Sequence, residues 1–307
     1  MLNLQDVELK LGKKKVLNKL NLEVMEHELC GLVGPEYSGK SILCRVVAGL
    51  VTPDSGEVLY LGRNISKDEL YRWDIGYMPE KVELYRYQQV LEYYIFFGQL
   101  YGMSTQIAKQ RALEVLERIG LTNAKEEYLS KLNKGTRQKL LVGRALLHRP
   151  RLLILDEVLT GIDPVSKVEL QALLMDLKKQ GLSILCTSSD LDSISKICDK
   201  IAIIDAGTIV AVGTVEEILH LKQRSNPILV RVNRGIEEAV GVLRSNPRVT
   251  SLSRKENVIS IWFDGEEGEE AFILSQLVQC GIEVSAFYRE ESDFDSLYLK
   301  ITQATEK

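Results

Sequence analysis

One segment constrains how this chain can fold more than any other: Gly34-Pro35-Glu36-Tyr37-Ser38-Gly39-Lys40-Ser41, which has the pattern G-x-x-x-x-G-K-S. It follows a short apolar stretch, residues 29–33, and precedes residues 42–50, which can continue as a helix. A strand, a glycine-containing loop and a helix in that order surround a phosphate group with backbone N–H groups and the positive end of the helix dipole. A chance glycine turn would not need this context, so the segment predicts a nucleotide site.

The residues of this loop have distinct expected roles. The Lys40 ammonium should reach the β- and γ-phosphates of the nucleotide, and the Ser41 hydroxyl should bind Mg²⁺. The nucleotide contacts expected from this segment are Gly34, Pro35, Glu36, Tyr37, Ser38, Gly39, Lys40, Ser41 and Ile42.

A second segment carries two acids directly after an apolar run. Residues 152–155 are Leu-Leu-Ile-Leu, and Asp156 and Glu157 follow. Such a run predicts a buried parallel strand with carboxylates at its carboxyl end. Beside a phosphate loop, Asp156 would help to hold Mg²⁺ and Glu157 would polarise the attacking water. Alone, the acid pair could merely cap the next turn, but the phosphate loop favours the catalytic interpretation.

Composition limits the classes of protein that remain. The chain has 307 residues, 45% of them hydrophobic, and a net charge of −4, which favours a globular protein of two domains over a nucleic-acid-binding one. There is no basic-then-apolar leader and no apolar run of the ~20 residues that a membrane helix needs. We therefore expect a cytosolic chain whose membrane role, if any, depends on a partner. The cysteines are scattered and odd in number, which favours buried reduced thiols over disulfides or a metal site: Cys30, Cys44, Cys186, Cys198 and Cys280.

Hydrophobic spacing gives a coarse map of the first 222 residues. The predicted strands are 4–11, 16–24, 57–61, 75–80, 182–188, 200–205 and 209–213, and a turn is expected over Gly12–Lys15. Residues 88–116 have helical spacing with several aromatic residues, which predicts an inserted helical subdomain. A helix should start near residue 214, and the polar segment 222–227 predicts a domain boundary.

The remaining chain predicts a small α+β domain. Expected strands are 228–232, 249–254, 257–263 and 282–288, and expected helices are 236–245, 271–280 and 293–302. The βαββαβ order is typical of a split βαβ fold. Its cysteine and aromatic residues are spaced as core, the acidic run 264–270 reads as a solvated loop, and no group of residues suggests chemistry. A regulatory or subunit-contact role stays open.

Two further loops carry a resemblance to a known family. Leu132-Asn133-Lys134-Gly135-Thr136 opens a helix, and Val158–Pro164, which contains Asp163, follows the acid pair. Over residues 1–222 the order and spacing of these motifs resemble the ATP-binding subunits of ATP-binding cassette (ABC) transporters. The Lys-Gly form of the first loop is similar to a bacterial branch that exports drugs, antibiotics or ions through a separate permease chain.

The resemblance implies a fold and a mechanism. The fold would be an α/β phosphate-loop domain with an antiparallel β subdomain and a helical subdomain over 1–222, followed by an accessory α+β domain over 223–307. Two such chains, identical or not, would sandwich two molecules of ATP with Mg²⁺ at the cytoplasmic face of the membrane, peripherally, beside a permease. Each site would combine Lys40 and Glu157 of one chain with Asn133, Lys134 and Gly135 of the other, and the metal would be held by Ser41, Asp156 and Glu80.

Four positions depart from the family pattern. Leu11 stands where an adenine-stacking aromatic residue is usual, and Glu80 stands where the family has a glutamine. Asn133 replaces the serine of the family's signature loop, which is the loop 132–136 here. Ser189 replaces a histidine after a strand, which the family uses as a switch. A donor aimed at developing charge is typically worth ~10²–10³ in rate, so loss of the histidine should slow hydrolysis. Glu157 remains as a general base, worth on the order of 10²–10⁴. The catalytic residues are therefore expected to be Glu157, Ser189 and Glu80, with slow or partner-dependent turnover.

Two other functions fit parts of the sequence. A regulatory ATP-binding subunit, whose partner supplies catalysis, would explain Leu11, Asn133 and Ser189. A cassette ATPase acting in translation or DNA repair is the other alternative, but such proteins usually have two cassettes or a long coiled-coil insert. This chain has one cassette, and the interval from Lys40 to Gly135 leaves no room for a long coiled coil.

Overall fold

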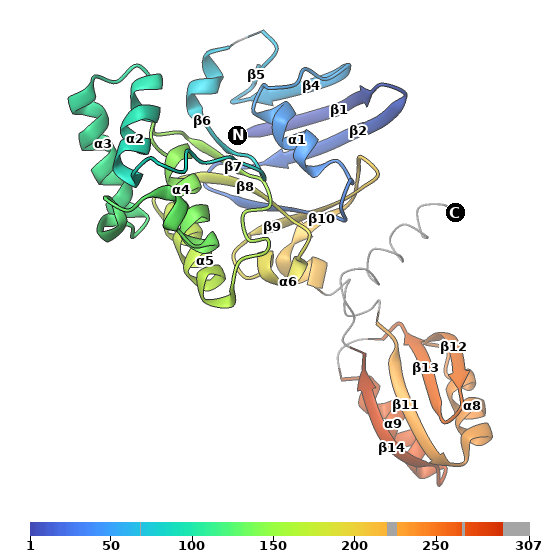
Figure 1. The fold of residues 1–307 in the computed structure, drawn as a ribbon. Helices are drawn as coiled ribbons and strands as arrows, with labels where there is room; N and C mark the ends of the chain where they lie inside the picture. Colours follow the sequence, from blue (N-terminus) through green and yellow to red (C-terminus); the bar gives the residue numbers. More distant parts are fainter. Residues whose placement is uncertain (68, 220–225, 266–267, 291–307) are drawn as a thin grey trace. The chain divides into compact units, whose positions relative to one another are not determined.

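The computed structural model describes residues 1–67, 69–219, 226–265 and 268–290. Contacts between Cα atoms divide the chain into two units, Met1–Val215 and Glu216–Lys307, which are described separately (Figure 1). Residues 215–219 are helical, near the helix start expected at residue 214. Most of the polar segment 222–227 lies outside the described residues, so the boundary at residue 222 stays a prediction.

The first unit is built on a six-stranded sheet with the order β10-β9-β3-β8-β7-β6. Its strands are β3 (Leu29–Val33), β6 (Ile75–Met78), β7 (Leu152–Leu155), β8 (Ser183–Ser188), β9 (Lys200–Asp205) and β10 (Thr208–Thr214). All neighbours are parallel except β9 and β10, which form a hairpin. Every residue of β3, β7 and β8 is buried, as the apolar runs predict. Because these three strands are parallel, the segments that follow them meet at one edge of the sheet.

A second, antiparallel sheet contains β1 (Leu2–Leu11), β2 (Lys14–Val24), β4 (Ser55–Tyr60) and β5 (Arg63–Asn64) in the order β2-β1-β4-β5. Its apolar face shares a core with α1 (Lys40–Val47), which contributes Leu43, Val46 and Val47. The turn between β1 and β2 is shorter than predicted, because Lys14 and Lys15 already pair with Leu11 and Lys10.

Three helices lie together on one side of the first unit (Figure 1): α2 (Val90–Leu100), α3 (Thr105–Arg118) and α4 (Lys134–Ala145). The helical stretch predicted over 88–116 is two helices, since Gly102 takes a φ of +79° that ends the first one. Gly98 lets α2 approach Ala108 on α3, and the buried Tyr94 hydroxyl donates to the Leu140 carbonyl of α4 at 2.7 Å. The remaining helices are α5 (Pro164–Lys179), α6 (Leu191–Ile194) and the 3₁₀ turns Leu70–Asp74, Thr122–Ala124 and Leu129–Lys131.

The second unit has the predicted βαββαβ order. Its elements are β11 (Ile228–Arg234), α8 (Ile236–Ser245), β12 (Val249–Lys255), β13 (Val258–Phe263), α9 (Glu270–Gln279) and β14 (Glu283–Arg289). The strands form an antiparallel sheet in the order β12-β13-β11-β14, so β12 and β13 form a hairpin and β11 lies between two strands that are not its neighbours in the chain. One apolar core joins α8 and α9 to the sheet through residues such as Leu243, Leu277 and Ile261. The helix predicted over 293–302 lies outside the described residues.

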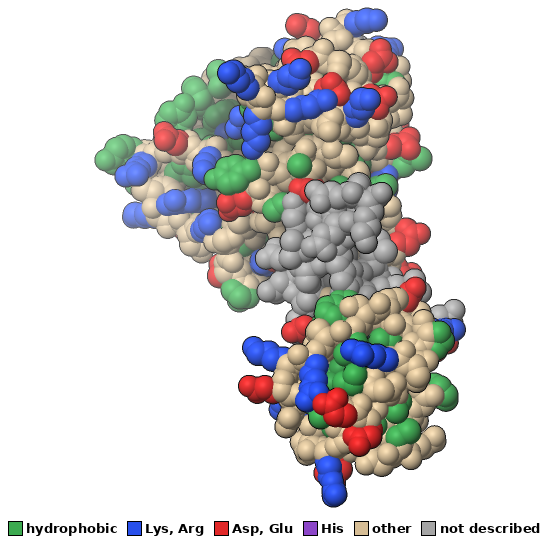
Figure 2. Space-filling model, turned by 90° about the vertical axis from the view of Figure 1, so that its right-hand side faces the viewer, with side chains coloured by type: hydrophobic (Ala, Val, Ile, Leu, Met, Phe, Trp, Pro, Cys, Tyr) green, Lys and Arg blue, Asp and Glu red, His purple; other side chains and the backbone are tan. Residues whose placement is uncertain are grey.

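Not every residue expected in the second core lies there. Cys280, Phe272 and Tyr288 are exposed, so their assignment to the core was wrong. Cys280 caps the end of α9, and Gly281 then turns the chain. Its place at the helix end, and not its apolar spacing, decides its exposure. On the face shown in Figure 2, basic and acidic side chains of this unit surround a group of hydrophobic ones.

The remaining cysteines match the prediction more closely. Cys30, Cys44 and Cys186 are buried free thiols, and Cys198 is half-buried. Burial raises the pKa of the Cys44 thiol well above its usual value, which keeps it protonated and unreactive. Among the described residues, no helix is long and apolar enough to cross a bilayer.

Candidate nucleotide site

A cavity of about 530 Å³ lies at the sheet edge where β3 and β7 end. The phosphate loop, Glu157 of the acid pair and β1 with β2 all contribute to it. Its lining residues are Leu11, Lys14, Val16, Glu36, Tyr37, Gly39, Lys40, Ser41, Ile42, Glu80, Lys81, Glu157, Thr160 and Ser189. Half of the twelve residues expected to contact the nucleotide, together with Glu80, Glu157 and Ser189, therefore face one cavity.

Glycines give the loop its path around this cavity. A Cβ on Gly34 would lie 2.3 Å from the Ile204 carbonyl oxygen, so only glycine fits there. Gly39 has a φ of +110° immediately before α1, a conformation that L side chains rarely adopt. Tyr37 also has a positive φ, +63°, although it carries a side chain. Strained backbone of this kind is typical of ligand-binding loops.

The Lys40 ammonium is held inside the loop. Its Nζ donates to the carbonyl oxygens of Gly34 at 2.6 Å and Pro35 at 2.8 Å, and lies 3.3 Å from Glu157 Oε1. The residue is only 5% exposed, so these contacts replace the water that a buried charge would otherwise lose. The positive charge is thus fixed at the centre of the phosphate loop, Gly34–Ser41, which we call the cradle, next to its backbone.

Asp156 lies directly behind the cradle. Its Oδ1 accepts hydrogen bonds from Ser41 Oγ at 3.1 Å and Thr187 Oγ1 at 2.8 Å. Burial raises the pKa of this carboxyl group, and the two hydroxyl donors oppose that rise. A carboxylate and a hydroxyl so close together are the hard oxygen ligands that Mg²⁺ takes in nucleotide sites, where phosphates and waters complete the shell. Within the described residues no three His, Cys, Asp or Glu side chains gather into a metal site.

Glu157 is positioned by its neighbours and by an unusual backbone. It has a φ of +52°, and its N–H donates to Thr187 Oγ1 at 2.9 Å. Its carboxylate accepts from the Thr160 hydroxyl, and Ser189 approaches it with its N–H at 3.3 Å and its Oγ at 3.4 Å. Ser189 therefore touches the expected base.

Six expected nucleotide contacts do not line this cavity: Gly34, Pro35 and Ser38, which belong to the phosphate loop itself, and Asn133, Lys134 and Gly135, which lie at the start of α4. Asn133 Oδ1 accepts the Thr136 N–H at 2.8 Å and caps α4. Gly135 packs so closely on α5 that an added Cβ would lie 2.1 Å from Ser166 Oγ. The loop thus presents the start of α4, away from this chain's own cradle.

The sequence interpretation overlooked two threonines that organise the acids, Thr160 and Thr187. Thr187 is placed by a register that only the structure shows, in which Leu155 pairs with Cys186 between the parallel strands β7 and β8. The residue after each partner must then be adjacent, which places Thr187 beside Asp156. Thr160 lies in the loop after Glu157, where its contact depends on the positive φ of the acid.

The fold and cavity define a phosphate-loop nucleotide-binding domain: a glycine loop between a buried strand and a helix, with a buried acid at the end of a nearby strand. Comparisons with known proteins specify the family. A family model described as ABC transporter matches residues 17–160. The linearmycin resistance ATP-binding protein LnrL of Bacillus subtilis is 30% identical over 309 residues, which cover 99% of this chain and 99% of the relative.

More distant proteins agree with this assignment. The lipopolysaccharide export system ATP-binding protein LptB of Haemophilus influenzae is 28% identical and covers 68% of this chain and 89% of its own length. A solved structure of an ATP-binding subunit of an ABC transporter has a TM-score of 0.62 at 27% identity, covering 72% of this chain and 92% of its own. The chain belongs to the ABC transporter family as an ATP-binding subunit, an ABC-type ATPase cassette. The family and the fold class predicted from the sequence are confirmed.

Proposed function

We propose that this chain binds ATP with Mg²⁺, hydrolyses it, and thereby drives export through a separate permease. The observation that carries the proposal is the convergence of Lys40, Ser41 and Glu157 at one cavity beside the glycine loop, with Asp156 hydrogen-bonded to Ser41 directly behind it. These groups are a phosphate-binding cation, a pair of hard oxygen ligands and a carboxylate base.

Each of these side chains has a distinct task in the proposed reaction. Lys40 neutralises phosphate charge, and Ser41 with Asp156 would hold Mg²⁺, which supplies further charge neutralisation when bound. Glu157 accepts a hydrogen bond from the attacking water and orients it toward the γ-phosphate. Before ATP enters, Glu157 pairs with Lys40, so binding must redirect the ammonium from the carboxylate toward phosphate oxygens.

A second ATP-binding chain is part of the proposal. The signature residues Asn133, Lys134 and Gly135 begin α4 outside the cavity that holds Lys40. Their backbone N–H groups at a helix start can bind an anion presented by another chain. If each of two chains presents this loop to the nucleotide cavity of the other, the pair completes two nucleotide sites.

A groove of about 560 Å³ is the proposed docking place for the permease. It lies between the segment that follows Glu80 and α4, and its lining includes Leu84, Arg86 and Arg137. Next to it in sequence, Tyr85 and Tyr87 are 57% and 90% exposed. Exposed aromatic residues with arginines are typical of protein–protein contacts. Such docking would place the chain at the cytoplasmic face of the membrane.

The direction of transport rests on the relatives. The chain and the linearmycin resistance protein LnrL align over 99% of each other, and the LptB relative is named for an export system. Agreement over the whole length includes the second unit, which favours the same kind of task over a role in translation or repair.

A regulatory subunit with impaired catalysis is the second candidate. It is favoured by one observation: Ser189 stands against Glu157, where a longer donor could also reach the phosphate. Under this alternative the chain binds ATP and closes on a partner, but the partner's site performs most of the hydrolysis.

The test is to purify the chain together with a candidate multi-span membrane protein, such as one encoded beside its gene, and to measure phosphate release. We expect co-purification, Mg²⁺-dependent hydrolysis, and a loss of about 100-fold or more in Lys40→Ala. Lys13→Ala, which changes an exposed lysine in the β1–β2 turn, is the matched control and should behave as wild type. Equal turnover in Lys40→Ala would overturn the site, whereas a chain that hydrolyses ATP but does not associate with the membrane protein would overturn the export role alone.

A further inference from the structure

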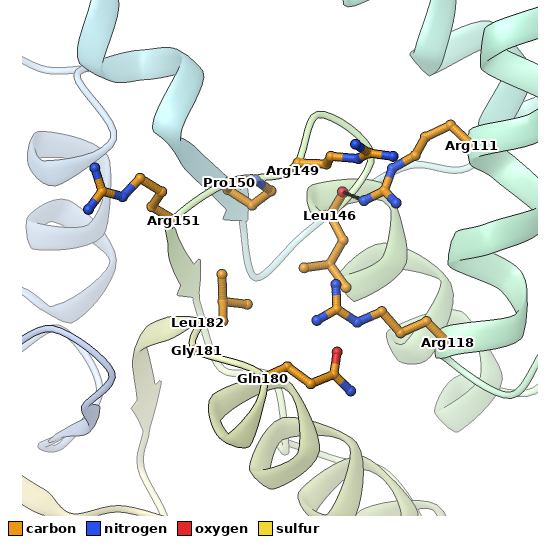
Figure 3. Close-up of a pocket in the computed structure, with 9 residues that line it drawn as sticks. All are labelled: Arg111, Arg118, Leu146, Arg149, Pro150, Arg151, Gln180, Gly181 and Leu182. Atoms are coloured by element: carbon orange, nitrogen blue, oxygen red, sulfur yellow. Dashed lines mark hydrogen bonds between the residues drawn. The ribbon is translucent and has the colours of Figure 1, made fainter.

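A second cavity, of about 340 Å³, lies at the opposite edge of the six-stranded sheet (Figure 3). It is lined by α3, by residues 146–151 before β7, and by residues 180–182 before β8. It is therefore at the amino ends of the two strands whose carboxyl ends face the nucleotide cavity, and the two cavities share no lining residue. Four of its nine lining residues are arginines, and none is acidic: Arg111, Arg118, Arg149 and Arg151.

Arg118 is the residue that points to a ligand. It leaves the last turn of α3 and extends between Leu146 and Gln180 (Figure 3). Its Nε is buried and has no hydrogen-bond partner among the described residues. A buried guanidinium donor without an acceptor is unfavourable, and native structures rarely leave one. An oxygen-bearing anion in the cavity would supply the acceptor.

The other arginines leave an excess of positive charge around Arg118. Arg111 donates to the carbonyl oxygens of Leu147 at 2.9 Å and Leu146 at 2.7 Å, and pairs with Glu114 at 3.0 Å. The same Glu114 is the partner of Arg149 at 3.4 Å, so one carboxylate serves two arginines.

Among the described residues, no ion pair joins an acid to Arg118. Burial and the charge of Arg111 lower the pKa of Arg118, and Asp176 opposes this effect. Arg151 projects away from the cavity (Figure 3) and lies 3.9 Å from Glu26. The unpaired charge in the cavity is therefore centred on Arg118, with Arg111 and Arg149 next to it.

We propose that this cavity, which we call the arginine pocket, binds a small phosphorylated anion. The guanidinium group donates in a planar fork that matches phosphate oxygens. The Gln180 side chain lies on the same side of the cavity, with its amide oxygen toward Arg118 (Figure 3). A volume of 340 Å³ is at the lower end of small-molecule sites and holds a phosphate or diphosphate group with a compact body. A nucleic-acid backbone would instead need an extended row of cations, which a single cavity of this size does not offer.

The test is a titration of the ¹⁵N-labelled full chain with inorganic pyrophosphate, followed by NMR. The backbone amides of Gln180 and Gly181 and the Nε–H of Arg118 report on the arginine pocket, and those of Ser38 and Gly39 report separately on the ATP cradle. We expect saturable shifts at both places in the wild type. Arg118→Gln should weaken binding at the arginine pocket by about tenfold or more while leaving the cradle unchanged.

The matched control is Lys109→Gln, which removes one positive charge from an exposed position on the same helix and should leave both affinities unchanged. The spectrum of each variant also shows whether it is folded. Arg118→Lys keeps the charge but loses the fork, and we expect an intermediate affinity. Shifts at Gly181 that do not saturate, an equal affinity in Arg118→Gln, or an equal loss in Lys109→Gln would each overturn the proposal.

Discussion

Ser189 is the residue whose replacement is most informative about turnover. Its hydroxyl and N–H both approach the Glu157 carboxylate, yet the side chain is too short to bridge from that acid to a bound γ-phosphate. We expect Ser189→His to raise the hydrolysis rate by about tenfold or more, because an imidazole can donate to the developing charge while contacting the base. ATP affinity should change little, since the cradle is untouched.

Phosphate release and nucleotide binding, measured for the same samples, check this expectation. Glu157→Gln is the reference for a site without a base, and its rate should fall on the order of 10²–10⁴. Brisk hydrolysis by the wild-type chain alone, with no response to either change, would show that the site is not slow. A gain seen only with the membrane partner would indicate that the second chain, including its Asn133, limits the rate.

His148 provides a pH-dependent part of stability. Its ring stacks on Tyr101, with centroids 4.4 Å apart, and its Nε2 lies 2.9 Å from the Ile75 carbonyl oxygen. Burial lowers the pKa of His148 in the folded protein, whereas the unfolded chain keeps the usual value near 6.5. The unfolded state therefore binds the proton more tightly, so stability is complete above pH ~6.5 and is lost as pH falls below it.

We expect His148→Gln to remove most of this dependence, because an amide can still donate to Ile75 but does not titrate. The measurement is the free energy of unfolding of the first unit by urea at pH 7.5 and 5.5. The control is His27→Gln, at an exposed histidine, which should keep the wild-type difference. If His148→Gln and wild type lose the same stability on acidification, other groups are responsible.

At the scale of elements, close helix packing depends on glycine at Gly143. An added Cβ there would lie 2.1 Å from the Tyr94 hydroxyl and 2.8 Å from Ile119 Cδ1, so α4 could no longer approach α2. Gly143→Ala should destabilise the first unit by about 1–3 kcal/mol, since overpacking outweighs the better helix propensity of alanine.

A matched change in the second unit should have the opposite sign. Gly241 lies within α8, and a Cβ there meets nothing within 4 Å. Gly241→Ala should therefore stabilise its unit by roughly 0.5–1 kcal/mol. Thermal unfolding of the two variants checks both signs, and a stabilised Gly143→Ala would show that α4 and α2 separate at little cost.

Elements were easier to predict than contacts, for a physical reason. Apolar periodicity located the buried strand β7 and the six described elements of the second unit, because burial of one face is a local property of the sequence. The pattern at Gly34–Ser41 likewise predicted the cavity now seen beneath it. The pairing of Lys40 with Glu157 joins residues far apart in sequence, and no local pattern encodes it.

The same limit applies to the arginine pocket and to the second core. Arg111, Arg118 and Arg149 are unremarkable in sequence and converge only because α3 and the segment before β7 are packed together. Cys280 and Phe272 had apolar neighbours, but their exposure depends on which side of α9 faces the sheet. Sequence spacing alone therefore places elements better than it places individual side chains.

At the scale of the whole molecule, the two units each have a core of their own, which predicts that they fold and act separately. All lining residues of the nucleotide cavity come from the first unit. A chain that ends at Lys222 should therefore bind ATP with the affinity of the full chain. We expect the two dissociation constants to agree within about twofold, a difference that corresponds to less than 1 kcal/mol.

Titration of the truncated and full-length chains with a fluorescent ATP analogue in the presence of Mg²⁺ gives the comparison, and circular dichroism reports whether the shortened chain is folded. Lys40→Ala in the truncated background is the control for binding at the cradle. A truncated chain that is folded but does not bind ATP would mean that residues 223–307 contribute to the site. If affinity is kept but association with the membrane partner is lost, the second unit has a contact role. We expect this result if the exposed Phe272 and Tyr288 of the second unit form a surface for another subunit, since large exposed apolar side chains are common where proteins meet.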